Sequence, residues 1–350
     1  MNNKIYKVID LSGFGNSGKT ALTNLFQEFS SQYWVAEPKF EFEILRIKHG
    51  LLDLENAIFD DWSPSRTSTS MYEFKKLILY IGNNPKKFDI LGRVFSSGLR
   101  LDRRFNNKFT TLSNNYFNSL IVKEYKAYNL YPFQNLPIVL MPILKFLDRI
   151  GKRSILNEKN ILPIQDKEVF YNLTREYLNN LCSALDIDNK ANTIVLNNAM
   201  EVYRPLKGLN LFFDAKQIAV DRDPRDLYLS SKVVDKFVGR YHMGFTASDD
   251  LDDFIYRYRY LRMNCPKDEY EQHQKLMKIN FESLVLDYDK TKKDIFDFCE
   301  CNENNHINPK KYFNPDISKK GVGMWKNVGG QLKKDIEKIY FELKDYCLDI

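Results

Sequence analysis

The segment 13–20 constrains this chain more than any other, because its letters, GFGNSGKT, match the phosphate-binding pattern G-x-x-x-x-G-K-[ST]. The apolar run at 4–11 before it predicts a buried strand, and 19–32 after it spaces its apolar residues along one helix face. Glycines let successive backbone N–H groups converge on a phosphate, and the following helix adds its dipole. The sequence therefore predicts a nucleotide-phosphate site. The residues expected to contact the phosphate are Gly15, Asn16, Ser17, Gly18, Lys19 and Thr20.

Further apolar runs extend this unit into an α/β fold. A short strand is expected at 34–36, and TIVL at 193–196 and QIAV at 217–220 predict two more. An order of strand, glycine loop, helix and strand is typical of a parallel α/β unit. We expect one domain over 1–350, a three-layer P-loop fold with a central parallel sheet. Additional predicted segments are helices at 225–237, 291–299 and 329–346, and a strand or edge segment at 278–286.

The stretch from 50 to 190 has a different pattern. Residues 63–70, SPSRTSTS, predict a loop, and most of the chain between there and residue 190 has helical rather than strand periodicity. We therefore expect a mainly helical insertion that acts as a cap over the acceptor. Its clearest predicted helices are 72–81, 116–126 and 167–185.

Composition narrows the functional classes. The net charge of +6 over 350 residues suits a polyanionic small molecule and is too diffuse to predict nucleic-acid binding. The longest apolar stretch, 136–147, contains Pro137, Pro142 and Lys145, and it is shorter than the ~20 residues that cross a bilayer. Five cysteines form no zinc pattern, so we expect no metal site, reduced thiols and a cytoplasmic protein without a transmembrane segment.

A second anion site is predicted after the run at 217–220. The strand there ends in Arg222, a turn with Pro224 begins a helix, and Ser230 lies two turns into it. Arg222 and Ser230 could therefore converge on one anion. At this point the chain resembles sulfotransferases that use 3′-phosphoadenosine 5′-phosphosulfate (PAPS). In that family an arginine at a strand end and a serine eight residues later hold the 3′-phosphate.

Two downstream segments support the resemblance. Residues 278–287, KINFESLVLD, resemble the family's Tyr-Glu-Asp-Leu segment, with Phe281 in place of Tyr, and 295–299 resemble the helix after that segment. Residues 319–326, KKGVGMWK, resemble the glycine-containing loop that completes the 3′-phosphate site. The resemblance covers the first 45 residues and about 193–330. It adds Phe281, Lys319, Lys320 and Gly321 as expected cofactor contacts.

The chain departs from the family pattern at three positions. The sulfotransferase loop usually has Lys or Arg at the position of Asn16 and a small or hydroxyl residue at that of Lys19. Lys319 stands where the cytosolic members have Arg, which keeps the charge and removes bidentate geometry. Either Lys19 takes over the bridging phosphate, or the loop serves a different nucleotide.

The resemblance implies transfer of the sulfuryl group of PAPS to a hydroxyl of a glycan or small-molecule acceptor, with 3′,5′-adenosine bisphosphate (PAP) as product and no metal required. Lys19 would stabilise the leaving group. Glycan-modifying members place a glutamate after the second strand, which makes Glu37 the expected base. Glu41 and Glu43 are rivals. His49 is the alternative by analogy with the histidine base of cytosolic members.

Two other functions remain open from the sequence. Asp221, which follows an apolar run, could bind magnesium in a P-loop kinase or nucleotide hydrolase that uses Lys19, with Arg222 in a structural ion pair. That interpretation accounts for Lys19 but leaves Ser230 and the segments 281–284 and 319–325 unexplained. A third possibility is a nucleotide-binding regulator whose helical region meets a partner. Magnesium dependence separates the kinase from the sulfotransferase.

Overall fold

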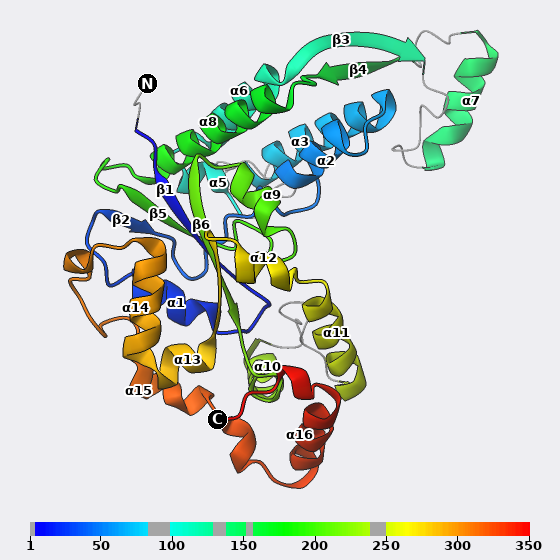
Figure 1. Cartoon of the computed structure of the whole chain (residues 1–350). Helices are drawn as coiled ribbons and strands as arrows, with labels where there is room; N and C mark the ends of the chain where they lie inside the picture. Colours follow the sequence, from blue (N-terminus) through cyan, green and yellow to red (C-terminus); the bar gives the residue numbers. More distant parts are fainter. Residues whose placement is uncertain (1–3, 83–98, 129–137, 152–156, 239–249) are drawn as a thin grey trace. The chain divides into compact units, whose positions relative to one another are not determined.

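The computed structural model describes residues 4–82, 99–128, 138–151, 157–238 and 250–350 (Figure 1). The chain divides into two compact units. The first combines Met1–Arg46 with Leu185–Ile350, and the second is Ile47–Ala184.

A five-stranded sheet forms the centre of the first unit, with the order β2-β5-β1-β6-β7 and all pairings parallel (Figure 1). This confirms the predicted α/β fold with a central parallel sheet. The strands are β1 (Lys7–Gly13), β2 (Tyr33–Val35), β5 (Thr193–Asn197), β6 (Asp214–Asp221) and β7 (Leu276–Asn280). Strands β1 and β5 are buried almost throughout, as expected for a parallel sheet that is covered on both faces.

The strand register brings the carboxyl ends to one edge of the sheet. Leu11 of β1 pairs with Asn197, the last residue of β5, and Gly13 pairs with Val220 of β6. Asp221, the last residue of β6, pairs with Asn280, the last residue of β7. The loops that leave these strands therefore start beside one another, which is where open parallel sheets bind ligands.

Helices cover both faces of the sheet. On one face, Ile9, Leu11 and Val220 pack in an apolar core with residues of α1 (Lys19–Phe26), α13 (Phe281–Leu286) and α14 (Tyr288–Cys299). Alternate strand residues point to the other face. There Gln217 accepts a hydrogen bond from Tyr270 of α12 (Lys267–Gln272) at 2.9 Å. The layers are therefore helix, sheet and helix.

Other helices of the first unit follow the sheet strands in sequence. Helices α10, α11 and α16 share a smaller apolar core around Phe254 and Ile339. The bounds are α9 (Pro205–Asn210), α10 (Pro224–Val238), α11 (Leu251–Met263), α15 (Pro315–Ser318) and α16 (Gly330–Glu342), with 3₁₀ turns η3 (Glu303–Asn305), η4 (Lys319–Gly321), η5 (Met324–Asn327) and η6 (Lys344–Tyr346).

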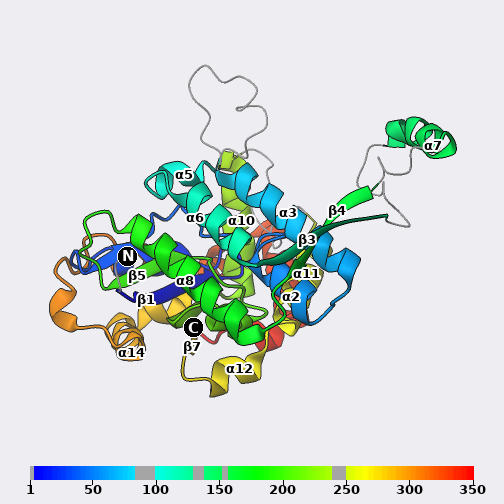
Figure 2. The same ribbon diagram turned by 90° about the horizontal axis from the view of Figure 1, so that it is seen from above.

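The second unit combines helices with one antiparallel hairpin, β3 (Ile121–Tyr128) and β4 (Asn157–Pro163), which Figure 2 shows from a second direction. Tyr116 stacks on Tyr177 at 4.5 Å between ring centroids and bonds to Thr174, so its core is partly aromatic. The remaining elements are α2 (Leu51–Phe59), α3 (Pro64–Gly82), α5 (Leu101–Arg104), α6 (Phe109–Ser119), η1 (Ile138–Leu140), α7 (Met141–Arg149) and α8 (Lys167–Leu185), whose last residue belongs to the first unit.

Two local predictions for the second unit are wrong. The predicted loop at 63–70 is the start of α3, because Pro64 suits a first helical position and the Ser63 hydroxyl accepts a hydrogen bond from the N–H of Arg66 at 3.2 Å. The predicted helix at 116–126 ends at Ser119, and β3 begins at Ile121. The β-branched and aromatic residues of β3 favour a strand when β4 is available as a partner.

The prediction of a strand or edge segment at 278–286 is wrong from Phe281 onward, since β7 ends at Asn280 and α13 occupies Phe281–Leu286. Within the described ranges, no helix combines the length and apolar character needed to span a membrane.

The loop after β5 is fixed to β1 by a buried carboxylate. Asp10 is fully buried and accepts hydrogen bonds from the N–H groups of Ala199 at 2.8 Å and Met200 at 3.1 Å. Ser12 and Gln217 donate to its second oxygen. Burial raises the pKa of Asp10, but these four donors offset part of that shift.

We expect Asp10→Ala to lower the free energy of unfolding by about 2–5 kcal/mol, because it leaves two backbone N–H donors buried without acceptors. Urea denaturation followed by circular dichroism measures the change. Asp289→Ala is the matched control, since the Asp289 side chain is 90% exposed. A loss no larger than that of the control would show that Asp10 does not hold the loop.

Candidate functional site

The loop predicted to bind phosphate, called the phosphate loop below, leaves β1 at Gly13 and enters α1 at Lys19. Three of its residues have left-handed backbone conformations: Gly15 with φ of 77°, Asn16 with 50° and Gly18 with 90°. Glycine and asparagine tolerate these angles better than other residues do. The loop therefore curls around the N-terminus of α1, where backbone N–H groups remain available to an anion.

Phe281 packs directly against this loop. A Cβ atom added to Gly18 would lie 2.4 Å from the Phe281 ring, so no side chain fits at position 18. Phe281 begins α13, immediately after β7. The loop and the segment that resembles the family's Tyr-Glu-Asp-Leu motif are therefore in contact.

Arg222 extends from the end of β6 into the same region and is 8% exposed. Its Nη1 donates to the carbonyl of Asn16 at 3.4 Å, and its Nη2 donates to the carbonyl of Gly321 at 2.6 Å. The guanidinium lies 4.9 Å from the centroid of the Phe281 ring. Arg222, Asn16, Phe281 and Gly321, which are distant in sequence, thus meet in one place.

The charge of Arg222 is not neutralised by a direct ion pair in the described part of the chain. Two nearby arginines differ from it: Arg225 pairs with Asp223 at 2.6 Å and Arg262 pairs with Asp221 at 2.8 Å. Burial lowers the pKa of Arg222, and the more distant carboxylates Asp226, Glu282 and Asp223 offset this only in part. A buried cation held by carbonyl oxygens and a ring face is a suitable partner for an anion.

Several buried polar atoms have no hydrogen-bond partner among the described residues. They include the Oγ of Ser17 in the phosphate loop and the Nε of Arg222 itself. Buried hydrogen-bonding groups are normally satisfied. Both atoms belong to residues predicted to bind the cofactor, and a phosphate would supply acceptors for them.

The other residues predicted to bind the cofactor are Ser230, Thr20, Lys320 and Lys319, and they are less buried than Arg222. Ser230 is half-buried on α10, and no hydrogen bond joins it to Arg222 in the described structure. Thr20 and Lys320 are exposed. Lys319 is exposed on η4, where its Nζ lies 3.1 Å from Asp316.

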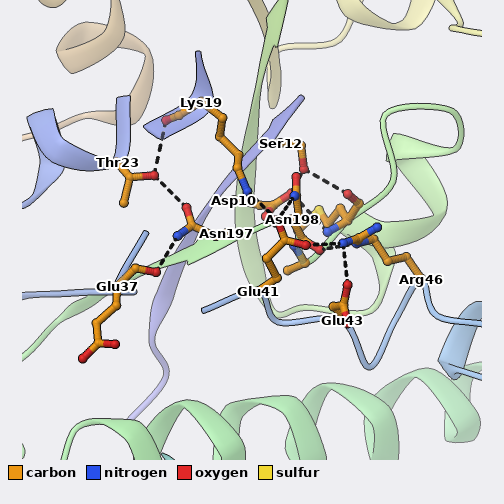
Figure 3. A network of polar contacts seen from close by, with 12 residues as sticks. Asp10, Ser12, Lys19, Thr23, Glu37, Glu41, Glu43, Arg46, Asn197 and Asn198 are labelled. Atoms are coloured by element: carbon orange, nitrogen blue, oxygen red, sulfur yellow. Dashed lines mark hydrogen bonds and ion pairs between the residues drawn. The ribbon is translucent and has the colours of Figure 1, made fainter. Parts of the chain in front are cut away.

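Lys19 lies in a network of polar groups shown in Figure 3. Its Nζ is 3.1 Å from Oε1 of Glu41, which also accepts from Nδ2 of Asn198 at 2.6 Å, while Arg46 bonds the other Glu41 oxygen at 2.7 Å. Burial lowers the pKa of Lys19, and Glu41 counteracts this. Burial alone would raise the pKa of Glu41, but Lys19 and Arg46 hold it below its usual range. Glu41 is therefore a stable carboxylate partner of Lys19.

The candidate bases occupy different positions. The Glu37 carboxylate is exposed and points away from the Lys19 network, while its backbone carbonyl accepts from Asn197 at 3.1 Å (Figure 3). Glu43 pairs with Arg46 at 2.9 Å, and burial raises its pKa. His49 belongs to the second unit, where its N–H donates to Asp53 at 2.7 Å before α2 begins.

Sequence reasoning missed the residues that position these groups. Asn198, with φ of 48°, orients Glu41, and the consecutive asparagines after the apolar strand were the available signal. Asp226 accepts from the N–H groups of Gly323 at 2.6 Å and Trp325 at 3.3 Å, which holds the loop that carries Gly321. Its position four residues after Arg222 gave no such indication.

Asp221, the candidate magnesium ligand, is engaged by two cations. One carboxylate oxygen lies 2.8 Å from Arg262 and the other lies 3.0 Å from Lys278. Burial alone would raise the pKa of Asp221, but these cations hold it below its usual range. The three residues line a cavity of about 190 Å³. Asp221 therefore serves here as the centre of a buried ion-pair cluster.

The three-dimensional structure is similar to those of solved sulfotransferases. It has a TM-score of 0.40 and 12% identity to the sulfotransferase domain of the Synechococcus PCC 7002 olefin synthase, covering 99% of this chain and 98% of that chain. The sulfotransferase domain from the curacin biosynthetic pathway gives 0.41 and 12%, covering 98% and 99%. Sulfotransferase STF9 from Mycobacterium avium gives 0.40 and 12%, covering 100% and 78%. No protein-family model and no curated protein matches the chain.

Glu282 holds the turn that follows Arg222 through a hydrogen bond to its backbone. Glu282 is 1% exposed, and its Oε1 accepts from the N–H of Asp223 at 3.0 Å, while its Oε2 has no partner in the described structure. Burial raises the pKa of Glu282 to about 7 from an ordinary value of 4.5. Between pH 4.5 and 7, the folded protein therefore keeps a proton on Glu282 that the unfolded chain has released. The folded state is most favoured when Glu282 is protonated, and this contribution to the free energy of unfolding is lost as the pH rises through 7.

We expect Glu282→Gln to be more stable than the parent at pH 8, by up to about 3 kcal/mol, because the neutral amide removes the cost of a buried carboxylate. The difference should shrink as the pH falls from 7 towards 4.5. Urea denaturation at pH 5, 7 and 8 gives the comparison. A difference that does not change with pH would contradict the assignment of the protonated state.

Proposed function

We propose that this protein binds PAPS and transfers its sulfuryl group to the hydroxyl of a glycan or small-molecule acceptor. The observation that carries the proposal is the position of Arg222. This buried arginine lacks a carboxylate partner in the described structure and lies between the phosphate loop and η4. A ligand with phosphates at two separated positions would satisfy both the loop and Arg222. An adenosine with 3′ and 5′ phosphate groups meets that requirement.

The cofactor contacts follow from this arrangement. Backbone N–H groups of the loop, with Ser17 and Thr20, would hold the 5′-phosphosulfate, and Lys19 would stabilise the charge that develops on the bridging oxygen. Arg222 and Ser230 would hold the 3′-phosphate, with Gly321 and the lysines of η4 closing the site. Phe281, which packs between Gly18 and Arg222, would contact the nucleoside.

Lys19 must change partners when the cofactor binds. In the described structure its ammonium is paired with Glu41. A phosphosulfate at the loop would compete for this ammonium, and Glu41 would keep Arg46 and Asn198 as partners. Glu41 therefore keeps Lys19 oriented towards the loop, and its partly buried carboxylate stays paired when the lysine moves.

The acceptor hydroxyl needs a base. We propose Glu37, because Glu41 already makes three contacts with cations and an amide that stabilise its ionised form. In the transfer, the acceptor oxygen forms a bond to sulfur while the bond from sulfur to the bridging oxygen breaks. The acceptor proton goes to the Glu37 carboxylate, and the electron pair of the broken bond remains on PAP.

The competing kinase function depends on Asp221 as a magnesium ligand. Both Asp221 oxygens are engaged by Arg262 and Lys278, so binding magnesium there would require two ion pairs to break. This observation favours the sulfotransferase.

We also propose that the second unit acts as a cap for the acceptor and that the protein is cytoplasmic.

The first test is calorimetric titration with PAP in EDTA beside ADP and ATP with magnesium. We expect metal-free binding of PAP and a ten- to hundredfold loss of affinity in Arg222→Ala, because charge-assisted hydrogen bonds contribute roughly 1.5–3 kcal/mol. Arg259→Ala, which removes an arginine that pairs with Glu342 on the surface, is the control and should bind normally.

Unchanged affinity of Arg222→Ala for PAP would exclude Arg222 from the 3′-phosphate site. A preference of the parent protein for ATP with magnesium would instead support the kinase function. Comparison of PAP with ADP in the same variant separates the 3′-phosphate from the rest of the nucleotide, since only the PAP affinity should fall.

The second test concerns the base. We expect Glu37→Gln to bind PAP normally and to lose turnover by about 10²–10⁴-fold with an accepted hydroxyl substrate, as for loss of a general base. Glu41→Gln is the comparison, and it should weaken cofactor binding because Lys19 loses the carboxylate that keeps it oriented towards the loop. Near-normal turnover of Glu37→Gln would move the base to Glu41 or His49.

A further inference from the structure

Helix α7 exposes a stripe of large apolar side chains. Val139, Ile143, Phe146 and Ile150 are 79%, 57%, 61% and 49% exposed. Their spacing of four, three and four residues places them along one side of α7 and the turn η1 that precedes it. Leu140 is also 38% exposed beside them. We call these five residues the α7 stripe.

Exposed apolar residues at helical spacing require an explanation. Single exposed apolar side chains are common on protein surfaces, but a contiguous apolar patch marks an interaction site. The α7 stripe belongs to the connection between β3 and β4 and not to a helix that covers a sheet (Figure 1). Burial in the core of the second unit therefore does not account for it.

The same segment carries most of the chain's excess positive charge. Residues 121–163 contain seven Lys or Arg and three Asp or Glu, a net charge of +4 within a chain whose total is +6. Lys145 and Arg149 of α7 are exposed, as are Lys123 and Lys126 of β3. Apolar and basic groups thus occur together on this hairpin.

We propose that α7 docks in the interface of an anionic lipid membrane, with the α7 stripe buried among the lipids and Lys145 and Arg149 near the headgroups. An amphipathic helix with basic and large apolar residues favours this location. The positive charge of the hairpin complements a negative membrane surface, and it would repel a second copy of the same hairpin. None of the helices in the described ranges is suited to span the bilayer, so α7 would lie on the surface.

The experiment is cosedimentation of the full chain with vesicles of pure phosphatidylcholine, or of phosphatidylcholine with phosphatidylglycerol. We expect binding to the anionic vesicles only, and loss of that binding when the salt concentration rises from 0.1 to 1 M, where the Debye length falls from about 10 to 3 Å. Ile143→Glu with Phe146→Glu should reduce the bound fraction about tenfold or more. Lys145→Glu with Arg149→Glu should also reduce it.

The matched control is Tyr256→Glu with Phe341→Glu, which adds the same charges at side chains that are 66% and 82% exposed in the first unit. It should bind vesicles like the parent. Equal loss in this control would mean that added negative charge alone prevents binding, and it would overturn the role of the α7 stripe. Circular dichroism of each variant checks that the chain is folded.

Absence of vesicle binding by the folded parent would overturn the proposal. Light scattering after gel filtration would then test a second copy as the occupant, since a dimer that Ile143→Glu with Phe146→Glu converts to a monomer would identify the α7 stripe as a dimer interface. PAP titration is independent of both results, because the proposed nucleotide site lies in the first unit.

Discussion

Strand β1 pairs in parallel with β5 on one side and β6 on the other, and this constraint determines where the polar groups of the site can lie. The phosphate loop follows β1, the asparagines that orient Glu41 follow β5, and Arg222 follows β6. Since their registers align the carboxyl ends, the loop after β1 lies beside both later segments, although about 180 to 200 residues separate it from them in sequence. The buried Asp10 adds a second link, because it holds the backbone after β5 against β1. Any change that shifted this register would separate the loop from Arg222.

The electrostatic character of the site comes from an unequal distribution of carboxylates. Asp221 and Asp223 neutralise Arg262 and Arg225, whereas Arg222 between them has only carbonyl oxygens and an aromatic ring at direct contact in the described structure. Leaving a buried cation without a carboxylate costs stability. On the proposed function, this cost keeps Arg222 available to the 3′-phosphate of its ligand. The same reasoning applies to Lys19, whose partner Glu41 has other donors that remain when the lysine is drawn to a phosphate.

The sequence was sufficient where local pattern decides structure. The turn between β1 and α1 could be predicted because a glycine-rich segment between a strand and a helix has few alternatives. The position of Arg222 could be predicted because a strand end in a parallel sheet has a defined place, and the binding roles of both stay predictions. The Lys19–Glu41 pair could not be predicted, since it depends on how 36–46 folds over the sheet. Strand β3 was mistaken for a helix because its partner β4 lies about 30 residues away and periodicity over ten residues does not include it. Long-range pairing, and not propensity, decides such segments.

The position of Asn16 explains one departure from the sulfotransferase pattern. Its backbone is left-handed, with φ of 50°, and its carbonyl accepts from Arg222. Asparagine adopts this conformation more readily than lysine or arginine does, so the residue favours the loop geometry while its backbone contacts Arg222. On the proposed function the loop needs a basic side chain elsewhere, and Lys19 at the first turn of α1 supplies it from a partly buried position beside Glu41. On the proposed function, the exchange of positions between 16 and 19 therefore preserves the cation at the loop, and the titration of PAP against ATP decides which phosphate that cation serves.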